Sequence, residues 1–309
     1  AQAPLLRIAH RSRQAALAGR RRLAPTNPAM GYGQPDPIYG ALVYVPGGMV
    51  QPFPTGVSCD KCSALASGNP LVSAYTGPDG KFVLEDPPCG ADIPLVIQVG
   101  RWRRKITIPA VACCGETRLT KEQSRLPRNR TEGDIPLIAV VTGNADPIEC
   151  VLPKIGIDPS EYSQPSGTGR VRFYVANGAN FGLGTPAQSA LWGNPAELAK
   201  YDAVIADCEG SAVEKAPAWK NNVIDYTNKG GRVFASHYGY TWLYNTAPFN
   251  TTATCNVDQT QPPDLDAYVD TSFPKGVAFA TWLKNEGIVA LGLNPDTVVD
   301  TWNRLAREG

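Results

Sequence analysis

Histidine and long apolar runs are the two features that this 309-residue sequence has least of. Its two histidines, His10 and His237, exclude a catalytic zinc or iron centre built mainly from imidazoles. No apolar run approaches the roughly 18 residues that a membrane-spanning helix needs. The formal net charge is +1, so the whole chain gives no reason to expect a nucleic acid or a charged membrane as partner.

Common catalytic motifs are absent as well. No G-x-S-x-G sequence marks the serine of an α/β-hydrolase. The glycine-rich stretch FGLGTP at 181–186 lacks the lysine of a P-loop and the G-x-G-x-x-G spacing of a dinucleotide site, so we interpret it as a loop. We therefore expect no cofactor.

Turn-forming residues are abundant instead. The chain holds 30 glycines and 28 prolines, which favours many turns and short strands. From 39 to 126, several short apolar segments follow one another at about ten-residue spacing, as in a β-sandwich. The sequence GPDG at 77–80 predicts a tight turn between two of them, because proline presets φ and glycine accepts a positive φ.

The segment LVSAYTGPDGKFVLEDPPCGADIPLVIQVGRW resembles the carboxypeptidase regulatory-like, or transthyretin-like, domain. The residues that carry the resemblance are Thr76, Asp79, Gly80, Phe82 and Gly90. It implies a small seven-stranded, immunoglobulin-like sandwich over 36–126, usually non-catalytic and found on secreted or surface proteins. The run RWRRK at 101–105 is interpreted as a solvated strand face rather than a nucleic-acid site.

The first 35 residues differ from the rest. Six arginines and no acidic residue occur in the first thirty positions. We interpret this segment as a disordered basic arm, with a targeting segment or a polyanion-binding arm as alternatives.

Eight cysteines are present, at positions 59, 62, 89, 113, 114, 150, 208 and 255. Five of them lie between 59 and 114, a density that favours disulfides in a secreted domain. Zinc bound by Cys59, Cys62, Cys89 and Cys113 is the alternative. The pairing of the cysteines cannot be read from their spacing.

Strands and helices alternate after a linker predicted at 127–168. The segment 169–309 predicts an α/β flavodoxin-like domain with a mostly parallel sheet, incomplete at its C-terminus. Residues 217–230 predict a helix that starts at a proline and stops at Gly230. Two further helices are expected within 272–287 and 294–309.

The sequences YDAVIADCEG and NVIDYTNKGGRVFASHYGY resemble the class I glutamine-amidotransferase-like superfamily, and within it the ThuA-like branch. The resemblance implies a strand that ends in a sharp turn at the position of the attacking cysteine. His237 occupies that position here, which speaks against amidotransferase activity.

Polar and aromatic side chains cluster at or just after the predicted strand ends, where ligands bind in α/β folds. We predict Glu209 and His237 as a catalytic acid–base pair, with a nucleophilic Cys208 as a weaker alternative. The predicted ligand-binding residues are Asn177, Asp207, Tyr238, Tyr240 and Trp242. Aromatic rings beside carboxylates suit a carbohydrate or another polar small molecule.

The order of the two parts resembles large secreted proteins of uncharacterised function from myxobacteria-like bacteria, some of which continue into further domains. We expect a secreted, periplasmic or cell-surface binding or structural protein whose α/β crevice takes a polar small molecule. A hydrolase acting on sugars or esters is the alternative.

Overall fold

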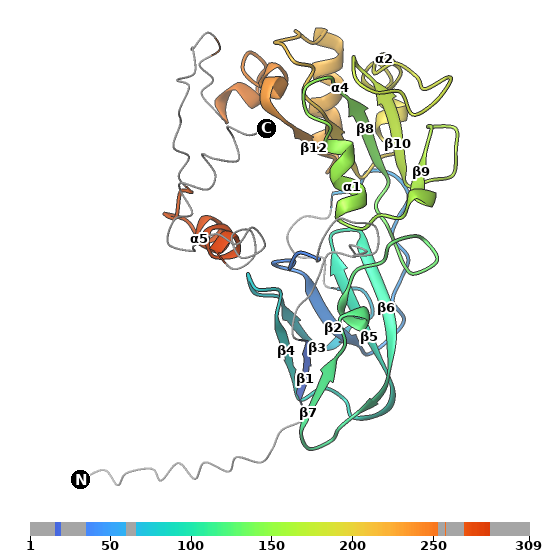
Figure 1. Cartoon of the computed structure of the whole chain (residues 1–309), viewed down its shortest axis with the longest axis vertical. Helices are drawn as coiled ribbons and strands as arrows, with labels where there is room; N and C mark the ends of the chain where they lie inside the picture. Colours follow the sequence, from blue (N-terminus) through green and yellow to red (C-terminus); the bar gives the residue numbers. More distant parts are fainter. Residues whose placement is uncertain (1–15, 20–34, 60–65, 253–256, 258–268, 285–309) are drawn as a thin grey trace, which may run out of the picture.

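The computed structural model describes residues 16–19, 35–59, 66–252, 257 and 269–284. Two parts follow one another along the chain. Residues before about 120 form an antiparallel sheet and a smaller mixed sheet, and a parallel sheet follows them (Figure 1). The fold is therefore rich in sheet and has two parts, as the sequence predicts.

The first part contains a four-stranded antiparallel sheet in the order β3-β2-β5-β6 and a three-stranded sheet in the order β4-β1-β7. In chain order the strands are β1 (Ala16–Gly19), β2 (Leu42–Pro46), β3 (Pro70–Tyr75), β4 (Phe82–Glu85), β5 (Gly90–Val99), β6 (Trp102–Val111) and β7 (Glu116–Leu119). One apolar core joins both sheets, with Val43, Leu84, Leu95 and Leu119 buried in it. Alternating side chains of β2, β4 and β5 supply much of this core, as in a sandwich.

The GPDG turn between β3 and β4 forms as predicted. The backbone amide of Gly80 donates to the carbonyl of Gly77 at 2.9 Å, and Gly80 has a φ of +69°. The amide of Lys81 donates to the Asp79 carboxylate at 3.0 Å. This Asx turn, in which the Asp79 side chain accepts from a backbone amide two residues further on, fixes where β4 begins.

The predicted disordered arm differs from the structure at one place. Ala16–Gly19 form β1, which pairs antiparallel with β4 and parallel with β7. Backbone pairing on both sides makes this stretch the central strand of the smaller sheet. The segments 1–15 and 20–34 of the predicted arm lie outside the described residues.

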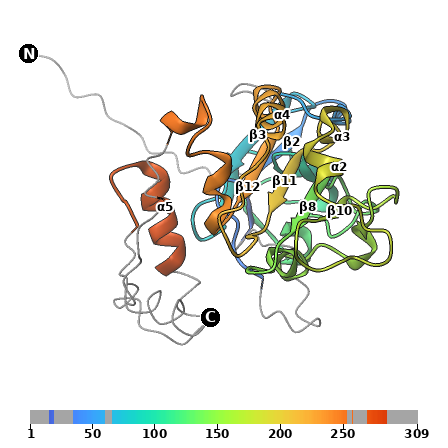
Figure 2. The same cartoon turned by 90° about the horizontal axis from the view of Figure 1, so that it is seen from above.

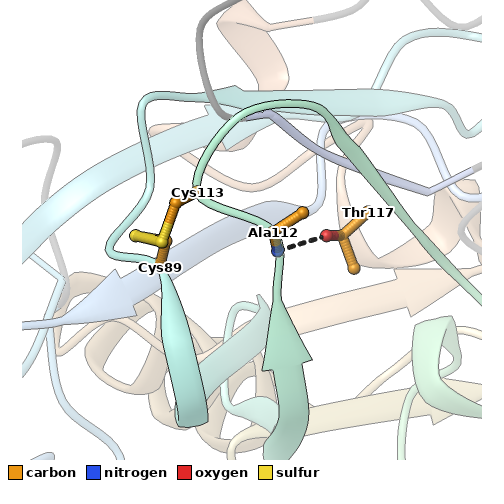
Figure 3. Close-up of a disulfide and its surroundings, with 4 residues drawn as sticks. All are labelled: Cys89, Ala112, Cys113 and Thr117. Atoms are coloured by element: carbon orange, nitrogen blue, oxygen red, sulfur yellow. Dashed lines mark hydrogen bonds between the residues drawn. A yellow bond between two sulfur atoms is a disulfide. The ribbon is translucent and has the colours of Figure 1, made fainter.

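Cys89 and Cys113 form a disulfide between the start of β5 and the loop that follows β6 (Figure 3). In the same loop, the amide of Ala112 donates to the Thr117 hydroxyl at 2.9 Å. The prediction of a disulfide is confirmed. The zinc alternative is wrong for Cys89 and Cys113, because bonded sulfurs cannot serve as thiolate ligands. Cys59 is exposed with a free thiol, and Cys62 lies outside the described residues.

The interpretation of RWRRK as a solvated face is wrong for two of its arginines. Arg101 and Arg103 are buried, because each meets a carboxylate of the second part of the chain. Arg101 pairs with Asp202 at 2.5 Å, and Arg103 pairs with Asp134 at 2.8 Å. These ion pairs tie the start of β6 to the parallel sheet.

The second part is built on five parallel strands in the order β12-β11-β8-β10-β9. The strands are β8 (Ile138–Thr142), β9 (Tyr162–Ser163), β10 (Val171–Val175), β11 (Ala203–Ala206) and β12 (Arg232–Ala235). Figure 2 shows β12, β11, β8 and β10 side by side in this order. The segment 127–168 differs from the predicted linker, because it supplies β8, the central strand of this sheet.

Short helices cover both faces of the parallel sheet. They are α1 (Val151–Lys154), α2 (Ser189–Trp192), α3 (Pro195–Leu198) and α4 (Pro217–Asn228). Short 3-10 helices occur elsewhere in the chain, at Glu122–Ser124, Ile148–Cys150, Pro159–Glu161, His237–Trp242 and Phe249–Thr251. Leu191, Leu198 and Val223 pack from α2, α3 and α4 on one face, and Leu152 packs from α1 on the other. Helix α4 stops at Gly230 with a φ of +100°, as its sequence predicts.

A last helix, α5 (Pro274–Trp282), lies to one side (Figure 1). The indole nitrogen of Trp282 donates to the carbonyl of Pro37 at 2.9 Å, which attaches α5 to the segment before β2. The helix predicted within 294–309 lies outside the described residues. Within the described ranges, no helix is both long and apolar enough to cross a bilayer.

Candidate active site

The candidate site lies where the strand order of the parallel sheet reverses. From β8 the chain crosses to β10 on one side, and it then returns to β11 on the other side of β8. The two loops that leave β8 and β11 therefore run in opposite directions and open a crevice between them, which is where ligands bind in such sheets. Gly143 and Asn144 follow β8, and Cys208 and Glu209 follow β11 shortly after its last residue.

The backbones at these strand ends approach closely because of two glycines. A Cβ at Gly143 would lie 2.1 Å from the carbonyl oxygen of Cys208, and a Cβ at Gly178 would lie 2.4 Å from the carbonyl oxygen of Gly143. Only glycine fits either position. The loops after β8, β10 and β11 are thus held together, with Cys208 against the loop of the central strand.

Cys208 and His237 form a thiol–imidazole pair at this place. The Cys208 Sγ and the His237 Nδ1 lie 3.2 Å apart. The backbone amide of Gly210 donates to the same sulfur at 3.3 Å. The sulfur is buried, with 1% of the Cys208 residue exposed, whereas His237 is exposed to solvent. An imidazole beside a thiol accepts its proton, and an amide donor stabilises the resulting thiolate.

His237 sits on a sharp backbone bend directly after β12. Its φ is +42°, in the left-handed region that residues other than glycine seldom adopt. Ser236 before it is extended, with a φ of −101°. A strand followed at once by a left-handed residue is the geometry that presents a reactive side chain at the end of a sheet in nucleophile-elbow enzymes. Here that bend presents an imidazole to the sulfur on the neighbouring strand.

Asp146 holds both halves of the pair in place. One carboxylate oxygen accepts a hydrogen bond from the Cys208 amide, and the other accepts one from the Ser236 hydroxyl. The carboxylate thereby joins the loop after β8 to the ends of β11 and β12. The positions of the sulfur and the imidazole relative to each other depend on this residue.

The predicted acid–base pair of Glu209 and His237 is partnered differently. The Glu209 carboxylate forms an ion pair with Lys215, whose side chain is 4% exposed, and it accepts from Gln188 at 3.5 Å. His237 contacts Cys208 instead. Within the described residues, no carboxylate is hydrogen-bonded to the His237 ring, so the arrangement is a pair rather than a triad.

Asp207 is buried directly before Cys208, and neither of its carboxylate oxygens has a hydrogen-bond partner at normal distance. Burial, together with the nearby carboxylate of Glu149, raises its pKa to about 9. Asp207 is therefore a protonated, neutral group at pH 7. It does not offer a negative charge to a ligand.

The remaining predicted ligand residues divide into structural and exposed ones. Asn177 donates from its side chain to the carbonyl of Glu209 at 2.7 Å, so it braces the loop. Trp242 is 4% exposed and packs on Trp192 at 4.5 Å between ring centroids, within the core. Tyr238 and Tyr240 are half-buried, and the Tyr238 ring lies 4.2 Å from the His237 ring.

The cavity among these residues is small. Its volume is about 10 Å³, and it is lined by Asp207, Glu209, Lys215, Tyr238 and Trp242 among others. That is room for about one water molecule. The cavity itself is too small to hold a substrate.

Sequence reasoning missed Asp146, Lys215 and Gly143. The signal for two of them was the sequence VVTGNAD at 140–146, in which a glycine and an aspartate follow an apolar strand. A similar pattern, an apolar strand followed by polar residues and a glycine, is what singled out Cys208 in the sequence. Lys215 left no signal, because its partner is fixed only by the course of an irregular loop.

Comparisons with known proteins leave the family of this chain open. No protein-family model and no curated protein matches it. Among solved structures, one chain of a type II cohesin–X-dockerin complex from Acetivibrio cellulolyticus, an N-terminal interface mutant, is 14% identical with a TM-score of 0.23. That match covers 47% of this chain and 85% of the other.

Proposed function

We propose that this protein is a cysteine-dependent hydrolase in which Cys208 is the nucleophile and His237 is the general base. The observation that carries the proposal is the 3.2 Å separation of Sγ and Nδ1 at the reversal point of the parallel sheet. A nucleophile within hydrogen-bond reach of its base is the geometric requirement for such chemistry. The ion-paired Glu209 is assigned a structural role.

The proposed reaction uses an ester or amide of a small polar acyl group. The Cys208 thiol transfers its proton to His237 as Sγ forms a bond to the carbonyl carbon. The leaving group departs with that proton, and a thioester remains. Water, deprotonated by His237, then cleaves the thioester, which releases the acid and restores the thiol. The backbone amide of Gly210 donates to this sulfur and would stabilise negative charge on it.

Two finer fold assignments accompany this proposal. Without β9, the strand order β10-β8-β11-β12 corresponds to the 2-1-3-4 order of flavodoxin-like sheets, which supports an amidotransferase-like, ThuA-type domain. The two sheets of the first part support a transthyretin-like sandwich. The Cys89–Cys113 disulfide supports a location outside the cytoplasm, where disulfides persist.

Thiol alkylation tests the proposal directly. We expect iodoacetamide to modify Cys208. We expect His237→Ala to lower the rate at pH 7 by at least about tenfold, because the imidazole that accepts the thiol proton is then absent. Cys150 is an exposed free thiol and serves as the internal reference, identified by peptide mass.

Hydrolysis is measured with p-nitrophenyl esters and γ-glutamyl anilides. Cys208→Ser and His237→Ala should each remove turnover, whereas Cys150→Ser should leave it unchanged. Turnover that survives in Cys208→Ser at the parent rate would exclude the thiol as nucleophile.

Carbohydrate binding is the second candidate, favoured by a row of tyrosines beside His237. Successive ring centroids from Tyr238 to Tyr240 and from Tyr240 to Tyr244 lie 6.1 and 5.7 Å apart. All three rings are half-buried, so each keeps some surface for stacking on a sugar. Calorimetric titration with neutral oligosaccharides should then give saturable heat that Tyr240→Ala removes and Cys208→Ser does not.

A further inference from the structure

A second cavity lies at the opposite end of the parallel sheet from Cys208. Its volume is about 720 Å³, and it is bounded by the loop 52–56, the start of β6 and the amino ends of β10 and β11. This size falls within the range of small-molecule sites in proteins. The apolar part of its wall includes Phe53, Pro54 and Ile135, and five cationic side chains make the rest of the wall positively charged. Those cations are Arg101, Arg130, Arg170, Arg172 and Lys200.

Carboxylates offset only part of this charge. Arg101 and Arg170 share one of them, Asp202, at 2.5 and 3.7 Å. Arg130 pairs with Glu161 at 3.0 Å, and Lys200 pairs with Glu197 at 2.5 Å. The other lining carboxylate, Asp134, is engaged by Arg103. Five cations and three carboxylates leave two positive charges in the wall.

The excess positive charge is located at Arg170, directly before β10, and at Arg172, near the start of that strand. The Nε of Arg172 donates to the carbonyl of Gly169 at 3.2 Å, and in the described part of the chain no ion pair joins Arg172 to a carboxylate. The Nε of Arg170 donates to the carbonyl of Ile135 at 2.7 Å. Burial lowers the pKa of Arg170, and the charge of Arg172 lowers it further. A bound anion would relieve both effects.

We infer that this cavity binds a small organic dianion, with its charged groups on Arg170 and Arg172 and its carbon skeleton against Phe53 and Ile135. Guanidinium groups hold carboxylate and phosphate oxygens through paired hydrogen bonds, so both a dicarboxylate and a phosphate monoester carry the required chemistry. The site is independent of the thiol–imidazole pair, because the whole length of the sheet separates them.

Isothermal titration of the full chain with succinate and with glucose 6-phosphate tests the inference and distinguishes the two sources of charge. We expect saturable one-to-one binding of at least one of them, and none of glucose. Arg172→Gln should weaken that binding by about tenfold to a hundredfold, and Arg172→Lys should weaken it less. Arg118→Gln is the matched control, since Arg118 is an exposed arginine paired with Glu116 on β7.

Three results would overturn the inference: no saturable heat up to about 10 mM of either probe, an equal loss of binding in Arg118→Gln, or inorganic phosphate binding as tightly as glucose 6-phosphate. If Arg172→Gln does not fold, Arg170→Gln replaces it, because Arg170 is the other proposed ligand and its side chain is 33% exposed. Alkylation of Cys208 should be unchanged in every variant, which separates this test from that of the hydrolase.

Discussion

At the scale of single residues, the site contains two residues in unfavourable states, one in its side chain and one in its backbone. Asp207 is a carboxylic acid kept neutral by burial and by the neighbouring Glu149. His237 keeps a left-handed backbone. Both conditions cost stability, and such costs concentrate at functional sites because the surrounding structure enforces them.

The gain in stability that Asp207→Asn gives over the parent should increase as the pH rises. The unfolded carboxyl loses its proton near pH 4, and the folded one keeps it up to about pH 9. The stability that this proton linkage supplies is fully present below pH 4 and is lost as the pH rises through the folded pKa. An amide has no such proton to lose. The variant's gain in Tm over the parent should therefore grow from pH 4 to pH 9 and then level off, as thermal unfolding at several pH values will measure. A gain that stays constant with pH would contradict the neutral state of Asp207.

His237→Gly should be more stable than His237→Ala by about 1 kcal/mol, because a Cβ in the left-handed region clashes with the backbone and glycine has none. Urea unfolding measures the difference. The same two substitutions at Ser236, which is extended, form the control and should give the opposite order. Alanine as the more stable residue at both positions would contradict the strained bend.

At the scale of elements, the site depends on side chains that join strand ends. Asp146 accepts hydrogen bonds from Cys208 and Ser236, which follow two neighbouring strands. Neither contact can form until β8, β11 and β12 are side by side. The pair of Cys208 and His237 is therefore a product of the assembled sheet rather than of either strand.

Asp146→Ala should lower the free energy of unfolding by about 2–3 kcal/mol, the usual effect of leaving donors to a charged acceptor unsatisfied. It should also slow the alkylation of Cys208 at pH 7, because the imidazole loses its fixed position. Asp146→Asn keeps an acceptor for the Cys208 amide and should recover most of both quantities. Unchanged alkylation in Asp146→Ala, measured against Cys150, would show that the carboxylate does not position the pair.

The sequence predicted local features well and long-range ones poorly. The GPDG turn and the stop of α4 at Gly230 each depend on a few adjacent residues, so their patterns were readable. The central place of β8 was not, because strand order depends on crossovers between segments far apart. The burial of Arg101 was missed for the same reason, since its partner Asp202 lies 101 residues further along the chain.

At the scale of the whole molecule, buried charge connects the two parts. Arg101 and Asp202 are each 6% exposed, and Asp202 also accepts the amide of Leu137 at 2.7 Å. Arg101 donates further to the carbonyls of Pro54 and Gly56. Removing one partner of a buried ion pair costs much stability, because the charge of the other partner is left buried and unpaired.

Asp202→Ala should lower the free energy of unfolding by about 3–5 kcal/mol. Glu116→Ala also breaks an ion pair with an arginine, but Glu116 and its partner Arg118 are 44% and 56% exposed, so its loss should be far smaller. Equilibrium unfolding in urea, followed by tryptophan fluorescence, compares the two variants. Equal losses would contradict the role of burial.

Trp102 extends this connection into the core of the second part. Its indole nitrogen donates to the carbonyl of Pro127 at 2.8 Å, and its ring packs with the apolar cluster beneath α1. A chimaera that grafted a foreign sandwich onto this parallel sheet would thus lack a tryptophan and two arginines on which the sheet rests. Any transplanted module would have to carry these three side chains at the corresponding hairpin to keep its contacts with the parallel sheet.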